Sequence, residues 1–214
     1  MSLNELDTPE YHIVPSKIVA NTIKESHNKW LETLGKKGQK RNDTNIRVFL
    51  DKEDLFFDKW DLLRYQSVDD RLIPSNIYDS LISFIPRLKD IEYAKLYPEQ
   101  QTGDGSIEHP FQMPFYEYAD VVHEFEKEVY KFEKDHPEFQ LNTYNNIFLM
   151  NGLRWDEEVM TKADVSNANG QVVMALILGA IRAERFCDGT LKDFLELGCI
   201  EKWLLRLQEI ASKI

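Results

Sequence analysis

An apolar run of ten residues, 172–181, constrains this sequence more than any other feature. It is about half as long as a bilayer crossing requires, so we predict a buried helix over residues 172–186 and no membrane segment. Asp188-Gly189 ends that helix, Gly198 ends a second short helix over 191–197, and a final helix follows. The final helix places its apolar residues on one stripe: Ile200, Trp203, Leu204, Leu207 and Ile210. We therefore expect three helices, joined by tight turns, to pack together.

The composition of the chain is that of a soluble globular protein. Its 214 residues are 43% hydrophobic and 29% charged, which excludes collagen-like, mucin-like and wholly disordered classes and leaves room for one large or two small domains. The N-terminal residues show neither a basic start nor an apolar segment, so we expect no secretory signal. Only two cysteines occur, Cys187 and Cys199, without metal-site spacing, which favours reduced thiols and a cytoplasmic location.

Charge is distributed unevenly along the chain. The formal net charge is -11, yet residues 24–47 include seven basic and three acidic residues, a net charge of +4. The basic region 24–47 and the acidic remainder of the chain differ in the sign of their net charge, which suggests two domains. We place them at residues 1–68 and 69–214, with the boundary in the polar, proline-containing stretch 66–76. The overall charge argues against a nucleic-acid-binding surface over the whole protein but leaves room for a local basic patch.

The predicted first domain is a small strand-helix fragment. Residues 11–14 have the pattern of a strand that Pro15 ends, and Ser16 is placed to cap a helix. That helix presents apolar residues at helical spacing and is expected to end near Gly35. We expect a further strand over residues 46–50 and a further helix from residue 51.

The predicted second domain is mainly helical. Besides the three C-terminal helices, we expect helices over 75–85 and 118–135, the latter amphipathic with its acidic residues facing solvent. Glycines mark a turn at 103–105, and Pro110 and Pro114 with their aromatic neighbours indicate an irregular connection. The predicted fold class is α+β, predominantly α: a small N-terminal strand-helix fragment followed by a helical domain.

Four ordered blocks near the N-terminus carry a family resemblance. They are 11–20 (YHIVPSKIVA), 26–33 (SHNKWLET), 35–40 (GKKGQK) and 59–63 (KWDLL). Residues 5–64 thereby resemble the C-terminal part of a family of small bacterial proteins similar to restriction-endonuclease-like nucleases. In such nucleases, acidic residues upstream of this segment hold the divalent metal that positions the attacking water. The resemblance implies a truncated nuclease-like fragment, and we expect no catalytic residue, no metal site and no cofactor.

The loop that follows the first helix is basic. Lys36, Lys37, Lys40 and Arg41 are interspersed with glycine and polar residues, where they can contact a phosphate backbone without specifying bases. A solvated, lysine-rich connection is the alternative interpretation. The loop therefore makes nucleic acid a candidate partner of this domain.

A separate resemblance covers residues 73–210. Its blocks are 114–118 (PFYEY), 181–191 (IRAERFCDGTL) and 197–200 (LGCI), followed by the final amphipathic helix. They resemble a bacterial and phage domain family of unknown function whose hallmark is an Arg-Phe-Cys-acidic-Gly motif. Ile181 stands where we expect a histidine at the start of that motif, so no role of that histidine carries over.

The motif has a structural interpretation. Its charged residues would form an ion-pair network that locks the turn after the apolar helix: Arg182, Glu184, Arg185 and Asp188. Gly189 would supply a positive backbone φ, and Phe186 would pack below the turn. We expect Cys187 to be buried rather than nucleophilic, because no histidine lies close in the sequence.

The motif also has a ligand-binding interpretation. Arg182 and Arg185, three residues apart, would bind an anion or a carboxylate in a pocket shared with Tyr116 and Tyr118. Elsewhere, an aspartate and a histidine at 120 and 123 share one helical face, but two ligands make a weak metal site. We therefore expect that histidine to be a structural surface residue.

These observations favour a non-catalytic binding or interaction module whose partner is another protein or a second copy of the chain. One alternative is a nucleic-acid-binding accessory that uses the loop 36–41. Another is a small-molecule enzyme or sensor with an arginine-lined pocket around Arg182 and Arg185.

Overall fold

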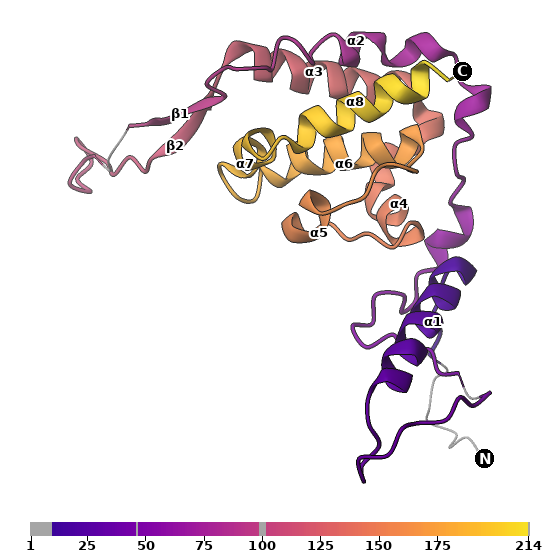
Figure 1. The fold of residues 1–214 in the computed structure, drawn as a ribbon. Helices are drawn as coiled ribbons and strands as arrows, with labels where there is room; N and C mark the ends of the chain where they lie inside the picture. The colour runs from indigo at the N-terminus through magenta and orange to yellow at the C-terminus, as the bar shows by residue number, and fades with distance from the viewer. Residues whose placement is uncertain (1–9, 46, 99–101, 214) are drawn as a thin grey trace. The chain divides into compact units, whose positions relative to one another are not determined.

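The computed structural model describes residues 10–45, 47–98 and 102–213 (Figure 1). Their contacts divide the chain into two compact units. The first unit comprises the described residues up to Tyr65 together with Met150–Gly152, and the second comprises Gln66–Leu149 and the residues from Leu153 onward. Helices dominate the described residues and the regular sheet has two strands, which confirms the predicted α+β, predominantly α, class.

The long helix predicted in the first unit is present as α1, Ser16–Glu32. Its boundaries differ slightly from the prediction. Pro15 occupies the N-cap position with extended backbone angles, and Ser16 is the first helical residue rather than a capping side chain. The helix ends at Thr33, whose N–H donates to the Trp30 carbonyl, two residues before the predicted stop at Gly35.

The predicted strand over residues 11–14 is wrong. His12 forms a single antiparallel bridge with Phe57, flanked by backbone hydrogen bonds from Ile13 N to Phe56 O (2.9 Å) and from Asp58 N to Tyr11 O (2.8 Å). One bridge lacks the neighbours that would extend it into a regular strand. The first residue of the strand predicted over 46–50 lies outside the described residues, and residues 47–50 are not in a strand.

The helix predicted from residue 51 is also wrong. The Asp51 carboxylate accepts hydrogen bonds from the backbone N–H groups of Leu55 (3.0 Å) and Phe56 (2.8 Å), so the side chain stabilises a turn in place of a helix. A short 3₁₀ helix, Trp60–Arg64, follows this turn.

The core of the second unit is built around α6, Gly170–Ala183. Every residue from 170 to 181 is buried, and α6 contacts α3 (Asp120–Asp135), α7 (Thr190–Glu196) and α8 (Cys199–Ala211) (Figure 1). These elements confirm the predicted amphipathic helix and the predicted C-terminal trio. The two turns occur where glycines were expected to break the chain, at Gly189 (φ 91°) and Gly198 (φ 71°).

The other helices of the second unit are short. The helix predicted over 75–85 is a 3₁₀ helix, Ser75–Tyr78, that continues into α2, Asp79–Ile82. Two helices were not predicted, α4 (Tyr144–Met150) and α5 (Glu157–Thr161). Short 3₁₀ helices occur at Asp70–Leu72, Pro137–Phe139 and Leu141–Thr143.

A two-stranded ribbon replaces part of the irregular connection that the prolines indicated. Strand β1, Ala94–Tyr97, pairs antiparallel with β2, Phe115–Tyr118, so that Ala94 faces Tyr118 and Tyr97 faces Phe115. Within the second unit the ribbon extends away from the helices (Figure 1). The outer part of the ribbon and its connecting loop expose apolar side chains: Leu96, Tyr97, Ile107, Phe111, Met113 and Phe115.

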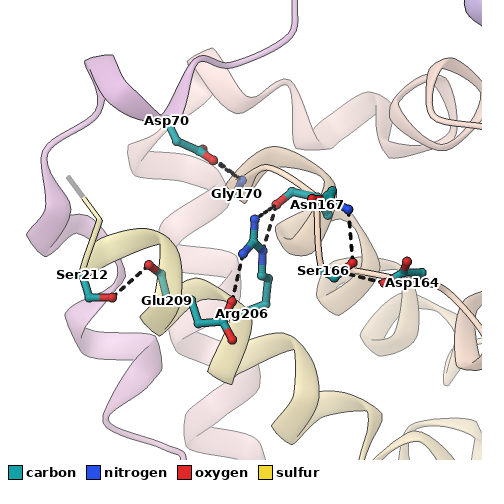
Figure 2. Close-up of polar contacts among 9 residues, drawn as sticks. Asp70, Asp164, Ser166, Asn167, Gly170, Arg206, Glu209 and Ser212 are labelled. Atoms are coloured by element: carbon teal, nitrogen blue, oxygen red, sulfur yellow. Dashed lines mark hydrogen bonds and ion pairs between the residues drawn. The ribbon is translucent and has the colours of Figure 1, made fainter.

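Polar contacts fasten the start of α6 to segments distant in sequence. Asn169 caps the helix by accepting from Val172 N (3.0 Å), and Asp70 accepts from Gly170 N (Figure 2). The fully buried Gln171 side chain accepts from Val68 N (3.1 Å) and donates to the carbonyl oxygens of Gln66 and Phe139. Residues 66–70 are therefore an integral part of the second unit.

The loop that precedes α6 is also bound by a side chain of α8. The Arg206 guanidinium donates to the Ala168 carbonyl from Nε (3.1 Å) and from Nη2 (2.9 Å), and it also pairs with Glu209 (Figure 2). None of the described helices combines the length and the apolar character needed to span a bilayer.

Candidate ligand-binding cleft and motif turn

The arginine- and cysteine-containing motif forms the turn between α6 and α7. The Glu184 carboxylate accepts from Gly189 N with one oxygen and from Leu191 N with the other, both at 2.8 Å. These N–H groups belong to the first turn of α7 and to the residue before it, where a helix lacks internal acceptors. Glu184 therefore acts as a cap for α7 that is supplied from the end of α6.

The two tyrosines of β2 fasten the ribbon to this turn. Tyr118 Oη accepts a hydrogen bond from Lys192 N (3.0 Å) and forms a second one with Glu184. Burial, followed by the hydrogen bond to Glu184, raises the pKa of Tyr118 well above its ordinary value. Tyr116 N donates to Asp188 (3.0 Å), and the Tyr116 ring packs so closely on Gly189 that a Cβ there would lie 2.6 Å from it. The tyrosines thus hold the turn in place.

The expected ion-pair network within the motif does not form among the described residues. Arg182 pairs instead with Glu133 of α3 (2.7 Å), and Arg185 donates to the Tyr130 hydroxyl (2.9 Å). The physical reason is that Glu184 is engaged by amide groups of the turn and Asp188 by the β2 backbone. The arginines therefore reach across to α3, where acceptors are available.

Two further expectations about the motif are corrected by the structure. Phe186 is 79% exposed rather than packed below the turn, although its ring contacts that of Trp155 edge-on (5.3 Å between centroids). Cys187 is exposed rather than buried. Both outcomes follow from the end of α6 at Ala183, because the next residues leave the helix axis and turn outward.

A cleft of about 540 Å³ lies between α3 and the C-terminal end of α6. Its α3 residues recur at the spacing of one helical face. The lining consists of Asp120, His123, Glu124, Glu126, Lys127, Tyr130, Ile181, Glu184 and Arg185. Most of these side chains carry charges and several are exposed, so the cleft is open and bordered by charged groups, although its accessible surface is mainly apolar.

Internal pairing leaves an uneven charge pattern in the cleft. Glu126 pairs with His123 (3.0 Å), and Glu124 pairs with an arginine outside the cleft. Across the described ranges, neither Lys127 nor Arg185 has a carboxylate within salt-bridge distance. The Arg185 guanidinium also lies over the Tyr130 ring, 5.6 Å from its centroid. Lys127 and Arg185 are therefore available to bind a ligand at the end of the cleft where Tyr130 lies.

The structure separates the four residues proposed from sequence as anion ligands. Of these, Arg185 alone lines the cleft; Arg182 lies over the Tyr144 ring (5.3 Å) and is engaged by α3, while Tyr116 and Tyr118 hold the motif turn. Sequence reasoning missed Lys127, which belongs to the polar face of α3 that was assigned to solvent. The signal that could have identified it is its spacing, four residues after His123 and three before Tyr130.

In the first unit, the basic loop forms a tight turn after α1. Lys36, Lys37 and Lys40 are exposed, whereas Arg41 lies over the Trp30 ring (4.8 Å) and donates to the Leu34 carbonyl (3.4 Å). A groove of about 380 Å³ lies between α1 and the described residues that follow the basic loop; its lining includes Ile23, Ser26, His27, Trp30, Thr44, Arg47, Val48 and Leu50. Trp30 thus belongs both to the groove and to the support of Arg41.

A group of potential metal ligands also lies in the first unit, at the bridge between residues 12 and 57. His12 Nδ1 is 2.9 Å from Asp51 Oδ2, and one ligand atom each from His12, Asp51 and Asp54 lie within 4.8 Å of one another. Burial opposes ionisation of Asp51, but hydrogen bonds from His12, Phe56 N and Leu55 N together hold its pKa below the ordinary value. Sequence reasoning missed this group because 39 residues separate His12 from Asp51.

Comparison with known proteins identifies a family. The profile of a family of unknown function, DUF6508, matches residues 73–213. No curated protein and no solved structure matches the chain.

Proposed function

Because the chain belongs to DUF6508, a family of unknown function, we propose its role from geometry: it is a non-catalytic binding module whose ligand site is the α3–α6 cleft. The ligand is a small molecule with a carboxylate or phosphate group, bound by Lys127 and Arg185. The observation that carries this proposal is the pair of cations in a cleft of about 540 Å³, neither of which has a carboxylate partner among the described residues. We also propose that the protein is located in the cytoplasm.

The chemistry of the two cations suits an anionic ligand. A guanidinium presents paired N–H donors that match carboxylate and phosphate oxygens, and the Tyr130 contact leaves Arg185 donors for a ligand. Lys127 adds a second positive charge one helical turn from Tyr130. Asp120 lies two helical turns from Lys127, about 10 Å along the axis. A ligand whose anionic group binds the two cations and whose other end carries an amino group would therefore gain a second contact, with the Asp120 carboxylate.

The position of the motif turn supports a binding role for the cleft. Glu184 lines the cleft, yet both of its oxygens accept from backbone N–H groups at the start of α7. Its contribution is therefore to hold the end of α6, and with it Arg185, in place. Glu184 thus supports the cation without itself contacting the anion.

A ligand screen tests this proposal on the full chain. Small carboxylates and phosphates are compared by the rise they cause in the unfolding temperature, and the best is measured by titration calorimetry. We expect Arg185→Gln and Lys127→Gln each to weaken binding by about tenfold, the usual value of one charge-assisted contact. Lys134→Gln is the matched control, since Lys134 is exposed on the same helix and does not line the cleft. Equal binding by wild type and Arg185→Gln would refute the proposal.

A second candidate function, which we propose from the first unit and its nuclease-like resemblance, is that of a nucleic-acid-binding accessory. It is supported by three exposed lysines, Lys36, Lys37 and Lys40, and by a groove of the same unit that has a tryptophan and Arg47 in its lining. Such a combination provides phosphate contacts and an aromatic surface for bases. The division into two domains, expected at 1–68 and 69–214, belongs to this proposal; it is supported by a separation of contacts, although the contacts separate after Tyr65, three residues before the expected boundary.

Retention on DNA at increasing salt distinguishes this second candidate. The chain with Lys36, Lys37 and Lys40 replaced by glutamine should elute at lower salt than wild type, with a shallower salt dependence. The matched control replaces three exposed lysines of the second unit, Lys89, Lys131 and Lys134. Identical elution of wild type and the loop variant would remove the loop from consideration. Binding of a protein partner or of a second copy stays a prediction.

A further inference from the structure

We infer that His12, Asp51 and Asp54 form a binding site for a divalent transition-metal ion of the zinc or cobalt class. The ion would join the segment around His12 to the turn that begins at Asp51, within the first unit. This site is independent of the α3–α6 cleft and of any ligand bound there. Its role is structural, since the three ligands connect two chain segments.

The spacing of the three ligand atoms suits a single ion. They lie within 4.8 Å of one another. Zinc bonds to imidazole nitrogen and carboxylate oxygen measure about 2.0–2.2 Å, so two ligands of one ion are at most about 4.4 Å apart. Asp54 is exposed, and its carboxylate has no hydrogen bond or ion pair among the described residues, so we expect its rotation to close the remaining distance.

Two of the three ligands are oriented by contacts that do not depend on a metal. The Asp51 side chain is 6% exposed and accepts from the N–H groups of Leu55 and Phe56. His12 is held by its bridge to Phe57, whose ring also meets the imidazole edge-on, 5.6 Å between centroids. Hydrogen bonds from the surrounding structure commonly orient metal ligands in this way. The site is therefore largely formed before an ion arrives.

The donor set indicates the class of ion. Two carboxylates and one imidazole form a ligand set with mixed nitrogen and oxygen donors. Imidazole suits zinc, cobalt and nickel, whereas magnesium and calcium favour sites made of oxygen alone. The negative charges of Asp51 and Asp54 also favour binding of a dication. We therefore expect zinc and cobalt to bind more tightly than magnesium.

A separate observation indicates that the first unit gains from such a link. Among its described residues, Phe56 and Leu62 are the buried hydrophobic side chains, and α1 has no buried residue. Small units with little core usually rely on a metal, a disulfide or a partner for stability. Phe56 lies at the proposed site, since its N–H donates to Asp51 and its carbonyl accepts from Ile13 N. A bound ion would thus stabilise the surroundings of a core residue.

Metal titration of the full chain, after removal of metals with a chelator, tests the inference. Cobalt is added while its visible absorption is recorded, and zinc or magnesium while thermal unfolding is followed. We expect one cobalt per chain with a spectrum of nitrogen and oxygen ligands, a rise in unfolding temperature with zinc, and a smaller rise with magnesium. A thiolate spectrum would overturn the inference, because it would assign the ion to a cysteine.

Variants complete the test. Asp54→Asn should fold as wild type, because the Asp54 carboxylate has no hydrogen bond or ion pair within the described ranges, and should bind cobalt at least about tenfold more weakly. His12→Gln should lose cobalt binding as well. Asp61→Asn, an exposed aspartate of the same unit, is the control and should bind as wild type. If Asp54→Asn keeps wild-type affinity, or if excess zinc leaves wild-type unfolding unchanged, the inference is wrong.

Discussion

Asp70 accepts the backbone N–H of Gly170 with both carboxylate oxygens, at 2.9 and 3.2 Å, across 100 residues of sequence (Figure 2). The N–H belongs to the first turn of α6, where a helix has donors without internal partners and favours a negative charge. Burial nevertheless raises the pKa of Asp70, because desolvation outweighs that hydrogen bond and the charge of Arg206. Asp70 therefore has two opposing effects: its carboxylate supplies the acceptor that Gly170 N–H requires, while burial disfavours the negative charge of that carboxylate.

Substitutions at Asp70 should separate these two effects. Asp70→Ala leaves Gly170 N without its acceptor and should lower the free energy of unfolding by about 1–3 kcal/mol. Asp70→Asn keeps an acceptor oxygen and removes the charge, so its loss at neutral pH should be smaller. Urea unfolding of both variants measures the difference. An equal loss in the two variants would contradict this account.

The pH dependence of the same variants follows from the sign of the shift. Below the ordinary aspartate pKa both states are protonated, and above the raised pKa the folded state carries the disfavoured charge. Asp70 therefore reduces stability as the pH rises through this interval. Urea unfolding across this interval should show that Asp70→Asn gains stability relative to wild type as the pH rises, whereas a difference that does not change with pH would contradict the prediction.

Gly170 and Tyr78 form a close contact that a double-mutant cycle can measure. A Cβ at Gly170 would lie 2.0 Å from Tyr78 Oη and 2.8 Å from its Cζ, so Gly170→Ala should destabilise the protein by about 1–3 kcal/mol. Tyr78 Oη is buried with no hydrogen-bond partner in the described part of the chain, so Tyr78→Phe should be neutral or stabilising. The double variant should lose less than the sum of the single variants. Strict additivity in thermal or urea unfolding would refute the contact.

The glycines on either side of α7 offer a matched comparison. Both have positive φ, 91° at Gly189 and 71° at Gly198, so alanine at either position introduces backbone strain of about 1 kcal/mol. A Cβ at Gly189 would in addition approach the Tyr116 ring to 2.6 Å, whereas nothing lies within 4 Å at Gly198. Gly189→Ala should therefore cost about 1–3 kcal/mol more than Gly198→Ala in urea unfolding. Similar losses at both sites would show that the ring moves aside freely.

The two cysteines should differ in reactivity. Cys187 is exposed, while Cys199 is buried in α8 and burial raises its pKa, which lowers the thiolate fraction at neutral pH. A thiol reagent should therefore modify one cysteine per native chain quickly and the second after denaturation. Mass spectrometry of Cys187→Ser identifies the reactive site, since that variant should lose the fast phase. A persistent fast phase would place the reactive thiol at Cys199.

The sequence predicted best those elements whose signals are local. The apolar run predicted α6 to within three residues at each end, and Gly189 and Gly198 located the turns that bound α7. The ribbon was missed because Phe115–Tyr118 alternates between exposed and half-buried side chains and follows a proline, which resembles an irregular connection. Four residues of weak alternation are too few to indicate a strand without knowledge of the partner strand.

The candidate sites were harder to predict, because they depend on contacts between distant residues. Arg182 and Arg185 were grouped by their spacing, yet they reach different partners on α3, Glu133 and Tyr130. The first unit was predicted least well. Its strand at residues 11–14 is a single bridge, and the Asp51 turn replaces a helix, because side-chain hydrogen bonds to the backbone outweigh weak local propensity.

The contacts of Gln171 bear on where a fragment of this protein should be cut. The family match begins at residue 73, but the Gln171 side chain accepts a hydrogen bond from Val68 N and donates one to Gln66 O. Both partners precede residue 73. An expression fragment starting at 73 would also discard Asp70 and expose the beginning of the most buried helix. Starting at Gln66 instead retains these contacts, so the family boundary falls several residues inside the folded unit.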